Sequence, residues 1–194
     1  METIDCMSTR RSVRAYTDEP VPWGVLERLM NLGVRAATGS GLEPWGFVVI
    51  QNRQEIDSWS DKIKAYSLAH IEWYPHLWNA VKWLENPKSN VFNHAGTLLI
   101  LYGDTRSHWY LHDGCLAAGQ IMLAAHDMGL GTCWIGYGEH VLNTPEFKAR
   151  YGVPEEYSLV CPLSIGYPKT QAPPRQRKPP VIFYPPSSSD SEQA

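Results

Sequence analysis

Basic side chains near both ends of the chain carry the clearest chemical signal in the sequence. The first cluster, residues 10–14 (RRSVR), combines three guanidiniums with a hydroxyl in Arg10, Arg11, Ser12 and Arg14. The second, residues 173–178, contains Arg175 and Arg177. Guanidiniums bind phosphate oxygens through parallel charge-assisted hydrogen bonds, so the two clusters are candidates for one shared anion site. A solvated surface is the other interpretation, because runs of charge usually face water.

A loop of small residues is the second candidate site. Residues 36–45 (AATGSGLEPW) lie between a predicted helix and a predicted strand, and they include Ala37, Thr38, Gly39, Ser40 and Glu43. Small residues let a flat ligand approach the backbone closely. A plain connection without a ligand is the commoner role of such a loop.

A glycine-rich stretch, residues 129–136 (GLGTCWIG), is the third candidate and contains Ile135 and Gly136. A dinucleotide-binding fingerprint must follow a strand and open a helix. This stretch instead closes a predicted helix and opens a predicted strand, so the fingerprint interpretation fails.

Other reactive residues give weaker patterns. His108, His112 and Asp113 have helical spacing for a metal, but they lack the closed ligand set that zinc requires. Ser40 lies between glycines, yet the pattern is not the G-x-S-x-G of a hydrolase. The four cysteines form no CxxC pair and are interpreted as reduced, mostly buried thiols.

Composition bounds the class of protein. The 194 residues are 43% hydrophobic and 19% charged, which is typical of one globular domain, here expected over residues 1–186 with a disordered tail at 187–194. A formal net charge of −3 argues against a globally basic nucleic-acid binder. No apolar run approaches the ~20 residues of a membrane span. The first residues contain no apolar signal core, so a cytoplasmic protein is expected.

Periodicity and apolar runs predict the elements that must position these groups. Helical spacing predicts helices at residues 23–36 and 113–128. Apolar runs predict strands at residues 47–50, 97–102 and 157–165, with a short strand or turn at 133–137. Helices and strands alternate loosely, which indicates a layered α/β domain.

Three further segments have less regular patterns. Pro162 places the strand at 157–165 at a sheet edge or at a bulge. Residues 57–84 mix tryptophan and tyrosine with charged residues and predict one or two irregular helices. Residues 181–184 are predicted to be a last extended strand.

Five motifs in one order resemble the FMN-dependent nitroreductase-like oxidoreductases. They are RRSVR, AATGSGLEPWGFVVI, GLGTCWIGY, LSIGYPK and PPRQRKPP. Each motif alone is weak, but together they cover nearly the whole chain, from Arg10 to Pro180. The resemblance implies a three-layer α-β-α sandwich that forms an intertwined homodimer, with two FMN molecules at the subunit interface and exchanged C-terminal arms.

The resemblance also assigns roles to residues. Arg10, Ser12 and Arg14 match positions that hold the FMN phosphate and ribityl chain, and Arg11 lies between them. Arg177, with Arg175 as a second candidate, matches the basic tail that closes on the same phosphate. The loop at 38–43, preceded by Ala37 as a further cofactor-binding candidate, matches the one along the isoalloxazine. Ile135 and Gly136 match backbone positions beside the reactive nitrogen of the flavin. Residues 57–90 correspond to a variable insert that roofs the pocket.

Two residues depart from the family pattern. Gly41 stands where an asparagine is common, and Glu43 where a glutamine is common. An ionised glutamate only accepts hydrogen bonds and opposes negative charge on a reduced ring. The hypothesis is that Glu43 lowers the reduction potential of the flavin.

The implied activity is reduction of nitroaromatics, quinones or a related small acceptor by NADH or NADPH through a ping-pong mechanism. No side chain is assigned as a catalytic acid or nucleophile, and no metal is expected. Two alternatives stay open: a specialised flavoenzyme that oxidises or fragments a particular substrate, and a non-catalytic FMN-binding protein. Stacking of flat substrates on the aromatic residues of 57–84 is possible, but an ordinary core role is commoner.

Overall fold

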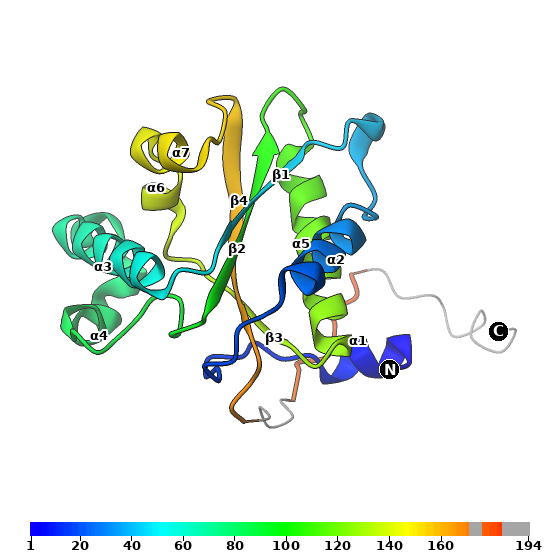
Figure 1. The fold of residues 1–194 in the computed structure, drawn as a ribbon, viewed down its shortest axis with the longest axis horizontal. Helices are drawn as coiled ribbons and strands as arrows, with labels where there is room; N and C mark the ends of the chain where they lie inside the picture. The colour runs from blue at the N-terminus through cyan, green and yellow to red at the C-terminus, as the bar shows by residue number, and fades with distance from the viewer. Residues whose placement is uncertain (171–175, 184–194) are drawn as a thin grey trace, which may run out of the picture.

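A four-stranded antiparallel sheet forms the middle layer of the molecule (Figure 1). The computed structural model describes residues 1–170 and 176–183. The sheet order is β1-β2-β4-β3, with the strands listed here by their bounds: β1 Trp45–Ile50, β2 Thr97–Asp104, β3 Gly131–Trp134 and β4 Tyr157–Gly166. The central strands β2 and β4 are buried over most of their length because helices cover both faces, which explains their continuous apolar runs.

Helices form the outer two layers. One face of the sheet is covered by α2 (Trp23–Gly33) and α5 (Tyr110–Asp127), and α1 (Thr3–Thr9) packs on α5. The other face is covered by α3 (Arg53–Ala69), α4 (Val81–Glu85), α6 (Glu139–Leu142) and α7 (Pro145–Tyr151). Short 3₁₀ turns complete the described chain: η1 Gly39–Gly41, η2 Ile71–Trp73 and η3 Pro75–Ala80. The predicted three-layer α-β-α architecture is confirmed (Figure 1).

Each face of the sheet has its own hydrophobic core. Leu26 and Leu29 of α2 pack with Ile121 of α5 against the sheet, and all three side chains are fully buried. On the other face, Ile63 of α3 and Phe147 of α7 are equally inaccessible. Burial of such side chains stabilises the fold by about 1.5–3 kcal/mol each.

Several details of the sequence interpretation are corrected. The helix predicted at 23–36 ends at Gly33, and the one predicted at 113–128 begins earlier, at Tyr110. The helices α1, α6 and α7 were not predicted. Pro162 lies in the inner strand β4 and not at an edge, and it pairs with Ile100 of β2. The β2–β4 register shifts between Leu101 and Tyr102, where Val160 is the extra residue, so the irregularity lies two positions before Pro162.

The end of the described chain also differs from expectation. Residues 181–183 form no strand, and their apolar side chains are exposed, Phe183 by 95%. Tyr184 of the predicted strand lies outside the described residues.

The arginine-bearing N-terminal segment runs in extended form beside β3. Ser12 forms a parallel bridge with Thr132, and the Val13 N–H donates to the Thr132 carbonyl at 2.9 Å. Farther along, the Thr17 N–H donates to the Tyr167 carbonyl at 2.8 Å. The motif RRSVR is thereby fixed at the open edge of the sheet.

Two glycines make this close approach possible. A Cβ on Gly131 would lie 2.6 Å from Cγ2 of Val13, and one on Gly166 would lie 2.9 Å from Cδ1 of Tyr16. Gly131 and Gly166 are themselves paired across β3 and β4. The glycines of GLGTCWIGY and LSIGYPK therefore form the surface against which RRSVR packs.

The four cysteines are free thiols, and three of them, Cys6, Cys133 and Cys161, are buried. None of the helices in residues 1–170 and 176–183 is long and apolar enough to cross a membrane.

We expect Gly131→Ala to destabilise the protein by about 1–3 kcal/mol, because β-branched Val13 cannot turn away from the new methyl group. Chemical denaturation with and without the substitution measures this. Gly24→Ala in α2, where nothing lies within 4 Å, is the matched control and should be neutral or stabilising. Equal stabilities of the two variants would contradict the packing argument.

Candidate functional site

Alternation along the extended N-terminal segment separates its basic side chains. Successive side chains of an extended chain point to opposite sides, so Arg10, Ser12 and Arg14 share one side. Ser12 and Arg14 are exposed, and Arg10 is half-buried. None of the three side chains has a hydrogen bond or ion pair with the described residues. This side of the segment therefore presents two free guanidiniums and a hydroxyl.

Arg11 points to the opposite side and is engaged locally. Its Nη1 donates to the carbonyls of Ser8 and Arg10, each at 2.8 Å, and thereby caps the C-terminal end of α1. It borders a separate cavity of about 780 Å³ between α1, the end of α5 and residues 168–170. The structure thus gives Arg11 a different environment from Arg10 and Arg14.

The electrostatics of nearby groups show that the arginines act on one region. Burial lowers the pKa of His126, and the charges of Arg10 and Arg11 lower it further. Burial raises the pKa of the Cys133 thiol, while Arg14 and Arg10 partly oppose that rise. The charge of Arg10 therefore acts both on His126 at the C-terminal end of α5 and on Cys133 of β3.

The backbone after β3 offers one unused donor. The Ile135 N–H donates to the Pro162 carbonyl at 3.0 Å, and its side chain is buried. Gly136 is exposed, a Cβ there would meet nothing within 4 Å, and its N–H has no hydrogen bond with the described residues. Of the two positions singled out in this motif, Gly136 is the one that can donate to a ligand.

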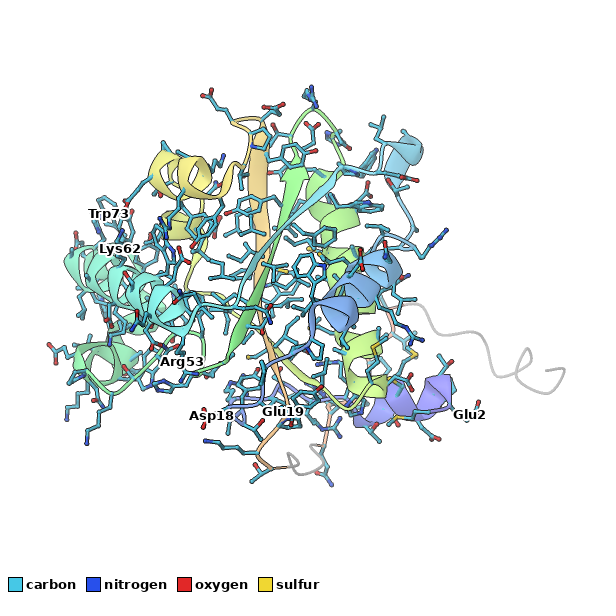
Figure 2. All side chains as sticks on the ribbon, in the orientation of Figure 1. Glu2, Asp18, Glu19, Arg53, Lys62 and Trp73 are labelled. Carbon is cyan, nitrogen blue, oxygen red and sulfur yellow. The ribbon has the colours of Figure 1, made fainter. Side chains whose placement is uncertain are left out.

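A cavity of about 390 Å³ opens beside Gly136, under the segment predicted to be a roof. Tyr66 of α3 and Tyr74, which precedes η3, line it together with Tyr137. The aromatic residues of 57–84 therefore divide. Trp59 is buried in the core, which is the ordinary role expected of these aromatic residues. The two tyrosines line a cavity, and the other tryptophans are exposed: Trp73, Trp78 and Trp83. Figure 2 shows Trp73 at the outer edge of the α3 side.

The loop at 38–43 is tied to α5 by a buried carboxylate. Asp113, 3% exposed, accepts hydrogen bonds from the Thr38 hydroxyl at 2.9 Å and from the Gly39 N–H at 3.0 Å. The same Thr38 hydroxyl oxygen accepts the Glu43 N–H at 3.2 Å. A chain of hydrogen bonds thus runs from Asp113 through Thr38 to Glu43.

This chain of hydrogen bonds holds a strained backbone. Ser40, Gly41 and Glu43 have φ values of 56°, 64° and 48°, in the left-handed region that only glycine adopts freely. Trp109 covers Gly39, where a Cβ would lie 2.4 Å from the indole. Ala37 and the Ser40 and Glu43 side chains face outward and are exposed. The loop therefore has a defined shape and presents open side chains.

The two candidate halves of the site lie far apart in one chain. The loop at 38–43 precedes β1 and is fixed at the start of α5, whereas RRSVR lies beside β3 and the end of α5 (Figure 1). Asp113 and His126 are separated along α5 by ~20 Å at the helical rise. The edge strands β1 and β3 are ~14 Å apart across the sheet.

The C-terminal basic cluster is only partly described. Arg175 lies outside the described residues. Arg177 is exposed and makes no ion pair with the rest of the described chain.

The weaker chemical patterns acquire other roles. The Asp113 carboxylate of the His108–Asp113 pattern accepts hydrogen bonds from the loop at 38–43. No group of three His, Cys, Asp or Glu side chains in the described part of the chain could hold a metal ion. The positioning role of Asp113 was missed because nothing in the sequence connects it with Thr38, which is 75 positions away. Its place in the first turn of a helix was the one available signal.

Comparison with known proteins agrees with this geometry. A family model described as Nitroreductase family matches residues 7–167. A putative NADH dehydrogenase/NAD(P)H nitroreductase of Archaeoglobus fulgidus is 23% identical, over 88% of this chain and 87% of the relative. Iodotyrosine deiodinase 1 of Rattus norvegicus is 26% identical, over 88% of this chain and 64% of the relative.

A solved structure shows the same fold. A nitroreductase with bound FMN from Bacteroides fragilis has a TM-score of 0.81 and 23% identity, and the match covers 97% of this chain and 100% of that one. The predicted nitroreductase-like fold is thereby confirmed.

We expect Asp113→Ala to loosen the loop, because the Gly39 N–H and the Thr38 hydroxyl would lose a charged acceptor. Hydrogen exchange should speed up at residues 38–43, and the free energy of unfolding should fall by about 1.5–3 kcal/mol. Asp18→Ala, at an exposed aspartate, is the control and should change stability by less than about 0.5 kcal/mol. Unchanged exchange in the loop would contradict the assignment.

Proposed function

The chain belongs to the nitroreductase family, and on that premise we propose that it is an FMN-dependent oxidoreductase that works in two steps. NADH or NADPH delivers a hydride and leaves. A nitroaromatic, a quinone or a related small acceptor then enters the same pocket and is reduced. The observation that carries the proposal is the free donor set of Arg10, Ser12 and Arg14 along β3, the strand that leads to the exposed Gly136 N–H.

The residues of this chain fit FMN. A phosphate needs several charge-assisted donors, which Arg10, Ser12 and Arg14 offer without a competing partner in the described chain. The exposed Gly136 N–H is a donor of the kind that the edge of a flavin ring accepts. Relatives of similar fold are described as having FMN bound, among them proteins of Bacteroides fragilis and Desulfitobacterium hafniense.

A second copy of the chain completes the proposed site. The separation of RRSVR from the loop at 38–43, ~20 Å along α5 and on opposite sheet edges, supports a site in which one flavin takes these segments from different chains. In a homodimer, the loop of one protomer reaches the arginines of its partner. Exposed Val181, Ile182 and Phe183 are suited to an arm that packs on that partner, with Arg177 and Arg175 closing on the phosphate.

The residues of the chain then have separate tasks. FMN, when bound, supplies the hydride chemistry. Arg10, Ser12 and Arg14 hold the phosphate, and the Gly136 N–H donates to the ring. Asp113 keeps the loop at 38–43 in one shape. The cavity beside Gly136 admits the second substrate.

A specialised reaction is the second candidate. The departures at Gly41 and Glu43 change the hydrogen-bonding groups that the loop presents to a flavin ring. Relatives named iodotyrosine deiodinase are about as similar to this chain in sequence as the nitroreductases are. Reductive removal of a ring substituent belongs to this alternative. A protein that holds FMN without turnover is the non-enzymatic alternative.

The test is an anaerobic half-reaction survey. We expect purified protein to be yellow, to lose its flavin absorbance on addition of NADH or NADPH, and to recover it with a nitroaromatic or a quinone. Recovery with halogenated phenols alone would favour the specialised reaction. Absorbance that no nicotinamide bleaches would leave the non-catalytic alternative.

Substitution of the proposed phosphate ligand sharpens the test. Arg14→Ala should weaken FMN binding by at least tenfold, since a charge-assisted hydrogen bond contributes about 1.5–3 kcal/mol. Arg53→Ala, at the start of α3, is the matched loss of one guanidinium and should leave affinity unchanged (Figure 2). Equal affinities in the two variants would refute the assignment of Arg14.

Glu43→Gln should raise the flavin reduction potential by roughly 30 mV, which is about 1.4 kcal/mol for a two-electron couple. The substitution removes a negative charge that opposes reduction and adds an amide donor. Potentiometry measures the change, with Glu155→Gln as an exposed control. An unchanged or lower potential would discard the hypothesis.

A further inference from the structure

The cavity beside Gly136 is built as an aromatic cage with one negative charge. Its rings come from α3, from the segment around η3, and from the chain after β3: Tyr66, Tyr74, His76, Tyr137 and His140. Glu139 is the acidic residue on the wall, and no lysine or arginine of the described chain lines it. The wall therefore combines aromatic rings with a carboxylate.

The rings are held in a mutual arrangement by stacking. His140 lies 5.7 Å from Tyr66 with 12° between the planes, and 5.3 Å from Tyr74. Tyr66 stacks in turn on His70 at 4.2 Å, so its faces are engaged by the two imidazoles and the ring faces left for a ligand are those of the other rings of the cavity. Rings braced in this way lose little conformational freedom when a ligand binds.

The carboxylate acts on the same space. Glu139 forms no ion pair with the described residues, so its charge is available to a ligand. The pKa of Tyr74 is raised, first by desolvation, then by Tyr66, and also by the charge of Glu139. The charge of Glu139 thus acts on the Tyr74 phenol.

We propose that this cavity binds a flat aromatic substrate that carries a positive charge, such as a ring bearing a quaternary ammonium. Ring faces attract organic cations through their quadrupole, and aromatic cages recognise quaternary ammonium groups in this way. Glu139 adds Coulombic attraction and disfavours aromatic carboxylates. The inference rests on the proposed function only in making this ligand the second substrate, because Gly136 joins the cavity to the proposed flavin site.

Binding of non-reducible probes tests the inference without turnover. Benzyltrimethylammonium, benzyl alcohol and benzoate share one ring and differ in charge. Calorimetry on the FMN-loaded protein should show the cation binding roughly fivefold more tightly than the alcohol, and benzoate more weakly than both. Benzoate binding as tightly as the cation would overturn the proposal, whether or not NADH or NADPH bleaches the flavin.

Two variants identify the groups responsible. Glu139→Gln should remove most of the preference for the cation over benzoate and leave the affinity for benzyl alcohol unchanged. Glu155→Gln, at an exposed site, should leave the affinities for all three probes unchanged. Tyr74→Leu should weaken binding of the cation more than binding of the alcohol. Retention of the full charge preference in Glu139→Gln would overturn the proposal.

The same charge series then extends to catalysis. With 4-nitrobenzyltrimethylammonium, 4-nitrobenzyl alcohol and 4-nitrobenzoate, KM should follow the order of the binding constants. If neither NADH nor NADPH reduces the flavin, the proposed function is refuted, but the binding result remains valid. Equal KM values for the three would refute the cage as the substrate site.

Discussion

The close approach of the N-terminal segment to the backbones of Gly131 and Gly166 is the constraint on which the rest of the structure depends. Only a residue without a Cβ lets Val13 and Tyr16 lie so near β3 and β4. This contact joins parts of the chain that are more than 100 positions apart. It places free guanidiniums along β3, the strand that leads to the exposed Gly136.

A second constraint operates at the other end of α5. The carboxylate of Asp113 is buried away from water and must be satisfied by hydrogen bonds. The loop at 38–43 donates these hydrogen bonds. The same bonds hold the loop in a conformation with left-handed backbone angles at Ser40 and Glu43. The helix α5 thus separates the loop at 38–43 from the arginine-bearing segment by about 20 Å.

Much of the fold could be predicted because burial leaves a pattern in the sequence. The apolar run TLLILY predicted the strand β2, and small residues at helical spacing predicted the helix α5. The helix α1 was missed because only Cys6 of its residues is buried, so no apolar stripe marks it. The motifs predicted where chemistry could occur, but hydrogen bonds such as Asp113 to Thr38 join distant positions and leave no local pattern. The cage around Tyr66 and Tyr74 likewise depends on tertiary packing.

The proposed half-sites lie on opposite sheet edges, and this placement would have a genetic consequence. In a homodimer, each flavin would take its arginines from one protomer and its loop from the other. A mixed dimer of a chain with damaged arginines and a chain with a damaged loop would concentrate both lesions in one site. The other site would be wild type, so two individually inactive alleles would complement each other when expressed together.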